Sequence, residues 1–190
     1  FTGLQPGEYV VQFVAPNGSI LSTANQGVDD AADSDAGTNG FTGCYELSSG
    51  ENETSVDAGL YKLASIGNKV WVDADKDGIQ DDTEAGVAGV KVSLLDANGA
   101  TVGGPQTTDA NGNYLFSDLV PGSYAVRFDL STLPQGYVVT TQDAAGSTDL
   151  NDSDADPVTG RTITTTLDSG ESNLSWDLGI QANIGIDLEK

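Results

Sequence analysis

One thirteen-residue motif occurs twice in this 190-residue chain, and the repetition restricts the possible folds more than any other feature. Residues 1–13 (FTGLQPGEYVVQF) and residues 116–128 (FSDLVPGSYAVRF) are identical at seven of thirteen positions. Further landmarks recur in the same order, namely DSDA at 33–36 and 152–155 and SGE at 49–51 and 169–171. The shift between copies, roughly 115 to 120 residues, is the size of a domain rather than of a solenoid repeat. The sequence therefore predicts tandem domains.

The positions of the copies predict how the chain is divided. Residues 1–65 would form the C-terminal half of one domain, and residues 66–180 would form one complete domain. Residues 181–190 would be the first strand of a following domain or a linker. Both ends of the chain are then expected to lie within an array.

The complete copy contains short β-branched or alternating segments and no helical periodicity, with Asn-Gly and Pro-Gly turns between them. The expected strands are residues 68–72, 90–96, 113–116, 123–129, 137–141, 161–167 and 173–178. About seven short strands in a domain of this size favour an all-β fold with two sheets in a Greek-key sandwich. The expected core residues are Trp71, Val92, Leu94, Phe116, Tyr124, Val126, Phe128 and Trp176.

The charge of the chain excludes several classes of function. Seven Lys and Arg against 29 Asp and Glu give a net charge of −22, which argues against nucleic acid and anionic membranes as partners. The sequence contains no apolar stretch near the roughly 20 residues of a membrane span. The sequence has no His, so histidine-dependent catalysis is excluded. Its carboxylates are expected to lie in exposed runs rather than in a cleft, so no enzyme is expected. The single Cys44 is expected to be a small buried residue or an intermolecular bridge.

Residues 73–84 (DADKDGIQDDTE) match the twelve-residue calcium-loop pattern at every fixed position. Ca²⁺ takes six to eight oxygen ligands, which residues at alternating positions of a curled loop supply, whereas Mg²⁺ demands stricter octahedral geometry. Gly78 permits the sharp bend. The expected ligands are Asp73, Asp75, Asp77, the Ile79 carbonyl, Asp81 and Glu84. Strand-like sequences flank the loop, so a structural ion is favoured over a helical calcium sensor.

A second acidic cluster follows later in the complete copy and recurs in the partial one. Its candidate ligands are Asp149, Asn151, Asp152, Asp154 and Asp156, with Asp33 and Asp35 in the first copy. Closely spaced carboxylates repel one another unless a cation neutralises them, so a second Ca²⁺ is predicted, with a solvated loop as the alternative. Asp109 and Asn111 are expected to cap a hairpin turn, with a role as outer ligands as the alternative.

With these motifs identified, the chain resembles the SdrD-like B domains, or B repeats, of bacterial surface adhesins. The resemblance rests on residues 66–73 (IGNKVWVD), 86–92 (GVAGVKV), 108–116 (TDANGNYLF), 119–124 (LVPGSY), 152–155 (DSDA) and 176–179 (WDLG). It implies a Cna-B-like, immunoglobulin-type sandwich stiffened by Ca²⁺. It also implies an extracellular location on the bacterial cell surface and a stalk built from neighbouring repeats.

Three functions follow as hypotheses. The leading one is a calcium-binding structural repeat that acts as a rigid stalk or spacer in adhesion. The second is a filament subunit in which copies of the chain assemble head-to-tail by strand complementation through residues 183–190. The third is a module that binds a glycan or a host matrix protein, with Trp71, Tyr137 or Trp176 as an exposed platform.

Overall fold

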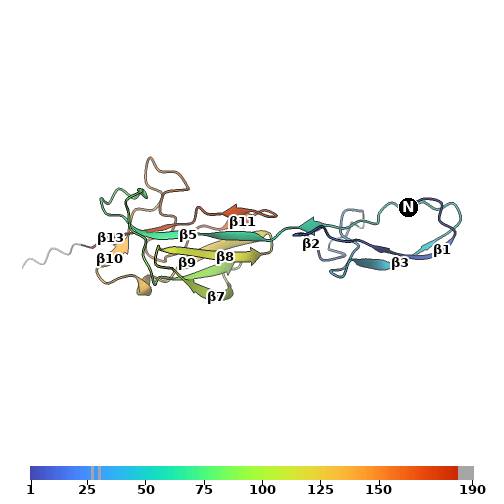
Figure 1. Cartoon of the computed structure of the whole chain (residues 1–190), viewed down its shortest axis with the longest axis horizontal. Coiled ribbons are helices and arrows are strands. Elements are labelled where there is room, and N and C mark those ends of the chain that lie inside the picture. Colours follow the sequence, from blue (N-terminus) through green and yellow to red (C-terminus); the bar gives the residue numbers. More distant parts are fainter. Residues whose placement is uncertain (27, 30, 184–190) are drawn as a thin grey trace, which may run out of the picture. The chain divides into compact units, whose positions relative to one another are not determined.

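A computed structural model describes residues 1–26, 28–29 and 31–183 of the chain (Figure 1). It divides into two compact units, Phe1–Leu63 and Ala64–Lys190. The all-β class is confirmed, since the described residues form strands, turns and a single short 3₁₀ helix, η1 (Leu130–Thr132). No helix in this part of the chain has the length and apolar character needed to span a bilayer. The filament hypothesis depends on a terminal strand of which residues 184–190 lie outside the described residues.

The second unit is an immunoglobulin-like sandwich of two sheets that enclose one apolar core. The first sheet has the order β10-β13-β5-β12, and β8 also pairs with β5. It comprises β5 (Ala64–Val72), β8 (Asn113–Leu119), β10 (Tyr137–Val139), β12 (Ser172–Asn173) and β13 (Leu178–Ala182). The second sheet, in the order β11-β9-β6-β7, comprises β6 (Lys91–Asp96), β7 (Thr101–Thr107), β9 (Gly122–Phe128) and β11 (Thr165–Leu167). Strand β13 pairs with β5 in parallel, so the last strand of the unit lies beside its first.

Side chains that alternate along the strands of both sheets fill this core. The predicted core residues Trp71, Val92, Leu94, Phe116, Val126, Phe128 and Trp176 are all buried. Tyr124 is only partly buried, and its hydroxyl donates to the Val120 carbonyl at 2.8 Å. Tyr114 was not predicted and is buried, with its ring at 90° to that of Phe128 and its hydroxyl 2.6 Å from the Trp176 carbonyl.

The strand predictions differ from the structure in several details. Strand β7 was missed, because its sequence TVGGPQT contains two Gly and a Pro, and such residues are tolerated at an edge such as the one that β7 forms. The strand predicted over 161–167 is shorter, since only Thr165–Leu167 is a regular strand. The segment predicted as one strand over 173–178 is divided between β12 and β13, and Trp176 and Asp177 lie in the irregular stretch between them.

The proposed aromatic platform is contradicted by the burial of both tryptophans. Trp71 is 0% and Trp176 is 5% exposed, so neither ring can stack on a sugar or a partner protein. Tyr137 is half-buried and packs against the core. The binding-module hypothesis therefore loses the rings on which it depended.

The first unit repeats local structures of the second. Strand β1 (Gly7–Gln12) pairs antiparallel with β3 (Phe41–Leu47), as β9 pairs with β11, and β2 (Ile20–Leu21) pairs with β4 (Leu60–Tyr61). The Tyr9 hydroxyl donates to the Gln5 carbonyl, as Tyr124 does to Val120. Glu51 accepts from the amide of Ser48, as Glu171 does from the amide of Asp168. The sequence repeat is thus also a repeat of hydrogen bonds.

The bond from the Tyr114 hydroxyl to the buried Trp176 carbonyl gives a first prediction. We expect Tyr114→Phe to lower the free energy of unfolding by about 1–2 kcal/mol, because a buried acceptor loses its donor. Tyr124→Phe, which removes an exposed bond, is the matched control and should cost less than about 0.5 kcal/mol. Urea denaturation followed by tryptophan fluorescence reports on the second unit, which holds both Trp residues. Equal losses in the two variants would contradict the prediction.

Candidate metal centre

The acidic loop 73–84 leaves the end of β5 and returns to the same strand. The Val72 amide donates to the Ala85 carbonyl at 2.9 Å, and the Val87 amide donates to the Val70 carbonyl at 2.8 Å. Gly86 lies at this crossing, where a Cβ atom would be 1.7 Å from the Asn111 carbonyl oxygen, so only glycine fits. Strand pairing therefore clamps both ends of the loop, and no helix borders it in the described structure.

Three carboxylates of this loop come together. Oxygen atoms of Asp73, Asp75 and Glu84 all lie within 4.8 Å of one another. Asp73 is buried at 1% exposure, Glu84 is half-buried and Asp75 is exposed. Three negative charges at this separation repel one another unless a cation or a proton neutralises them. An all-oxygen donor set of this kind suits a hard cation, so the cluster can hold a metal ion.

Backbone amides of the loop hold two of these carboxylates in place. Asp73 accepts from the amide of Lys76 at 2.7 Å and from that of Gly78 at 3.0 Å. Glu84 accepts from the amides of Ala74 at 2.7 Å and Asp81 at 3.0 Å, so its side chain closes the loop onto its own beginning. The loop has the curled form that its sequence predicted.

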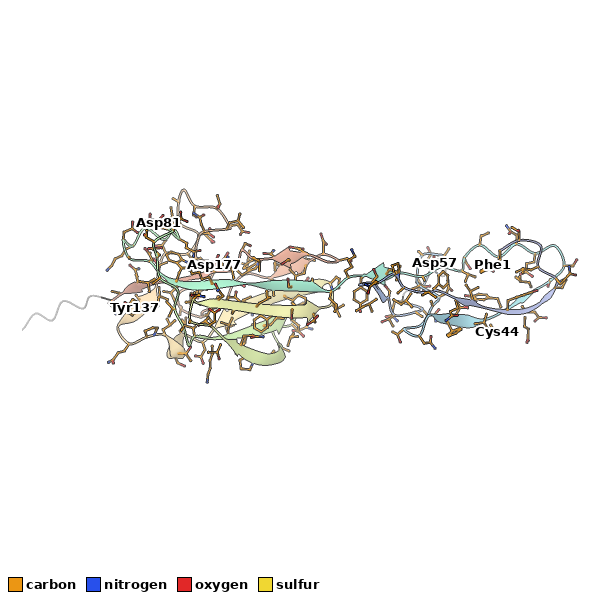
Figure 2. The ribbon with its side chains drawn as sticks, viewed as in Figure 1. Phe1, Cys44, Asp57, Asp81, Tyr137 and Asp177 are labelled. Carbon is orange, nitrogen blue, oxygen red and sulfur yellow. The ribbon has the colours of Figure 1, made fainter. Side chains whose placement is uncertain are left out.

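The other predicted ligands of this loop lie outside the three-carboxylate cluster. One oxygen of Asp77 accepts from the amide of Ile79 at 2.8 Å. Asp81 is exposed and lies in the loop beyond the end of β5 (Figure 2). The assignments of Asp77, Ile79 and Asp81 as ligands stay predictions.

In the second acidic loop, the described structure does not bring the predicted ligands into one cluster. Asp156 is half-buried, and its carboxylate accepts from the Thr159 hydroxyl and from the amides of Thr159 and Val158, which holds its pKa below the usual range. The side-chain oxygen of Asn151 accepts from the Thr148 amide at 2.8 Å, and Asp149 is exposed. Asp156 and Asn151 thus stabilise turns. In the same way, Asp109 accepts from the amides of Asn111 and Asn113, which confirms the predicted hairpin cap.

Asp152 and Asp154, in contrast, are buried. One oxygen of Asp152 accepts from the Ser147 hydroxyl at 3.1 Å, and the other is buried with no hydrogen-bond partner among the described residues. Burial raises the pKa of Asp152, and the charges of Asp143 and Asp149 add to this effect. Asp154 accepts from the amide of Asp177 at 2.5 Å.

Asp177 is a buried carboxylate that was not among the predicted metal ligands. Its oxygens accept from the Lys69 amide at 3.0 Å and from the Asn68 side chain at 2.9 Å, so it joins the last strands to β5 (Figure 2). Burial raises the pKa of both Asp154 and Asp177 to about 8. The recurrence of Asp-x-Gly at 57–59 and 177–179 was the sequence signal for this residue, since Asp57 occupies the same place in the first unit.

The first unit reproduces this arrangement. Asp35 accepts from the amide of Asp57 at 2.7 Å and from the Tyr45 hydroxyl at 2.9 Å. Its own amide donates to the Asp57 carbonyl, as the amide of Asp154 donates to Asp177. Asp33 is partly buried two residues before Asp35. In both copies, an aspartate of the DSDA motif thus accepts from a backbone amide that lies shortly before the last strand of the unit.

Comparison with known proteins gives a consistent family match. The family model described as the SdrD B-like domain matches residues 1–60 and 64–180. Serine-aspartate repeat-containing protein F of Staphylococcus epidermidis is 39% identical over 180 residues, which cover 94% of this chain and 10% of that protein. Serine-aspartate repeat-containing protein C of Staphylococcus aureus is 42% identical over 166 residues, which cover 84% of this chain and 17% of that protein. The chain thus spans less than a fifth of the length of these relatives.

Comparison with solved structures finds pilins at low identity and low TM-score. A minor pilin of Streptococcus agalactiae has a TM-score of 0.47 at 13% identity, over 82% of this chain and 69% of the pilin. A streptococcal ancillary pilin has a TM-score of 0.39 at 17% identity, over 88% of this chain and 46% of the pilin.

The raised pKa values of Asp154 and Asp177 predict how stability depends on pH. A carboxyl whose pKa rises on folding favours the folded state while it is protonated, so its contribution is lost as the pH rises from about 4 to about 8. In EDTA, we expect Asp154→Asn to flatten the fall in unfolding free energy between pH 5 and pH 8, measured by urea denaturation. Asp156→Asn is the control, because the lowered pKa of Asp156 acts only below about pH 4. An unchanged slope in Asp154→Asn would contradict the prediction.

Proposed function

The chain belongs to the SdrD B-like domain family, and we propose that it is a calcium-binding structural repeat that serves as a rigid spacer in an extracellular surface protein. The observation that carries this proposal is the cluster of Asp73, Asp75 and Glu84 in a loop whose ends are clamped to one strand. The proposed role is structural rather than enzymatic.

Calcium fits the loop better than other cations. The cluster offers only oxygen donors, whereas zinc sites are built mainly from Cys sulfur and His nitrogen. The loop also supplies further oxygens at Asp77, Ile79 and Asp81, and this number suits Ca²⁺, whereas Mg²⁺ prefers few protein ligands and keeps its waters. When bound, the ion would neutralise carboxylates that otherwise repel one another.

The surroundings of the loop support a stiffening role. Calcium sensors work by rotating a pair of helices, and here β5 and the pairing of Trp71 with Gly86 border the loop instead. An ion bound only by the folded state adds RT ln(1 + [L]/Kd) to stability, about 2.7 kcal/mol at a hundredfold excess over Kd. Extracellular modules bind Ca²⁺ with Kd values of about 10⁻⁴ to 10⁻³ M, which match millimolar extracellular calcium.

A second ion beside Asp152 and Asp154 is part of the proposal. The unpartnered oxygen of Asp152 and the buried pair of Asp154 and Asp177 place carboxylates with raised pKa values in one region. A cation there would offset the cost of burying these charges. Asp33 and Asp35 are the corresponding candidates in the first unit.

The cellular setting follows from the relatives. The matching staphylococcal proteins are named for their serine-aspartate repeats, and this chain corresponds to a small fraction of their length. We infer a location on the bacterial cell surface, where neighbouring repeats or further copies of the chain would be its partners. A row of stiffened domains would then hold a more distal part of the protein away from the cell.

The proposal predicts the effect of removing one ligand. We expect Glu84→Gln to weaken Ca²⁺ binding at the loop by about tenfold or more, because a bidentate charged ligand is lost. Asp82→Asn removes the same charge from an exposed position of the same loop that is not a ligand position, and it should bind as the unaltered chain does. Calorimetric titration of each chain measures the affinity and the number of ions. Equal weakening in the two variants would indicate a general charge effect and contradict the site.

The proposal also predicts a thermal effect. At a Ca²⁺ concentration about a hundred times Kd, the melting temperature of the second unit should rise by roughly 10 °C over that in EDTA. Scanning calorimetry with tryptophan fluorescence as a second probe measures this shift. A melting temperature that is the same in calcium and in EDTA would overturn the structural role.

A further inference from the structure

A residue far from the metal loop in the sequence contacts its buried carboxylate. The side-chain hydroxyl of Thr140 donates to Asp73, 67 residues away along the chain. Thr140 follows directly after β10 and is 2% exposed. Its amide donates to the Gly179 carbonyl at 3.0 Å, so the same residue also joins the end of β10 to β13.

This contact completes the set of donors around Asp73. Two of the three donors, the amides of Lys76 and Gly78, belong to the loop itself, and Thr140 supplies the third from another segment. An ionised carboxylate has about four acceptor positions, so three of these are occupied. The donors therefore fix the orientation of the Asp73 carboxylate and leave about one acceptor position for a cation.

A second contact and close packing hold the loop against the same segment. The amide of Gln80 donates to the Asn151 carbonyl at 2.7 Å. Gly78, with φ of +79°, lies so close that a Cβ atom there would be 2.8 Å from the Ala144 Cβ and 3.2 Å from the Thr141 carbonyl oxygen. The metal loop thus packs directly against residues 140–151.

The first unit shows that the hydroxyl position recurs. The amide of Ser22, directly after β2, donates to the Gly59 carbonyl at 2.9 Å, as that of Thr140 donates to Gly179. Ser22 is thus the counterpart of Thr140 and also carries a hydroxyl group. Among the described residues, the first unit has no counterpart of the 73–84 loop for this hydroxyl to contact. Ser22 is therefore a matched control that the chain itself provides.

We propose that Thr140 is a positioning residue for the metal loop: it orients Asp73 for a divalent cation and couples binding of that cation to ordering of residues 140–151. This inference rests on the proposed function, because it requires a cation in the loop. In metal sites, a hydrogen-bond partner of a ligand sets the orientation of that ligand, and its loss lowers affinity by about 10- to 100-fold. Thr140 has this relation to Asp73, although it does not itself belong to the three-carboxylate cluster.

The test uses the full chain and Ca²⁺ titration by calorimetry, with Glu84→Gln to identify the heat that belongs to the loop. We expect Thr140→Val, which keeps the side-chain volume and removes the hydroxyl, to raise Kd at this site by about tenfold. Thr140→Ser keeps the hydroxyl and should bind within about threefold of the unaltered chain. Ser22→Ala removes the corresponding hydroxyl of the first unit and should leave Kd unchanged. Equal affinity in the valine and serine variants would overturn the inference.

Amide hydrogen exchange gives a second readout that needs no valine variant. Added Ca²⁺ should slow exchange at Thr140 and at Gln80, whose amides donate to Gly179 and Asn151. The slowing should disappear in Glu84→Gln and persist in Asp82→Asn. If the unaltered chain binds Ca²⁺ at the loop but exchange at Thr140 does not change, the coupling is wrong while the proposed function stands. If the unaltered chain binds no Ca²⁺, both are wrong.

Discussion

Electrostatic repulsion among carboxylates is the constraint on which this structure depends. The chain has 29 acidic and seven basic residues, and the fold brings several of the acidic ones into close contact or full burial. Hydrogen bonds from backbone amides offset part of the free-energy cost of holding these charges close together or buried, as at Asp73, Glu84 and Asp177. The raised pKa values of Asp154 and Asp177 show that the amides do not offset all of it. We propose that a divalent cation completes this compensation.

The position of these carboxylates connects local chemistry to the architecture. Asp73 directly follows the first strand of the second unit, and its amide donates to the Ile180 carbonyl of the last strand. Asp177 joins the region before that last strand to Asn68 and Lys69. An ion at the loop would thus act at the place where the beginning and the end of the unit meet. A domain closed in this way would resist extension better than one whose terminal strands are joined by backbone pairing alone.

The sequence predicted much of this and failed for definable reasons. Alternating segments and turn pairs predicted most strands. Edge strand β7 was missed because Gly103, Gly104 and Pro105 have low strand propensity, although an edge strand, which needs few packed side chains, tolerates them. The curled loop at 73–84 could be predicted because the residues that define its pattern are close in sequence. The repeat marks the position of Asp177, but the hydrogen bonds of Asp177 and Thr140 join distant segments and could not be predicted from the sequence. The aromatic platform failed because composition cannot tell a buried tryptophan from an exposed one.

The central claim is that a calcium ion among Asp73, Asp75 and Glu84 is an integral part of the folded second unit. A high-resolution crystal structure of the chain grown in calcium, with anomalous scattering measured at a long wavelength, tests this most directly. The account predicts an anomalous peak surrounded by oxygens of these three residues at about 2.3–2.6 Å. Carboxylates that are bridged by water at this position, with no anomalous peak, would contradict it.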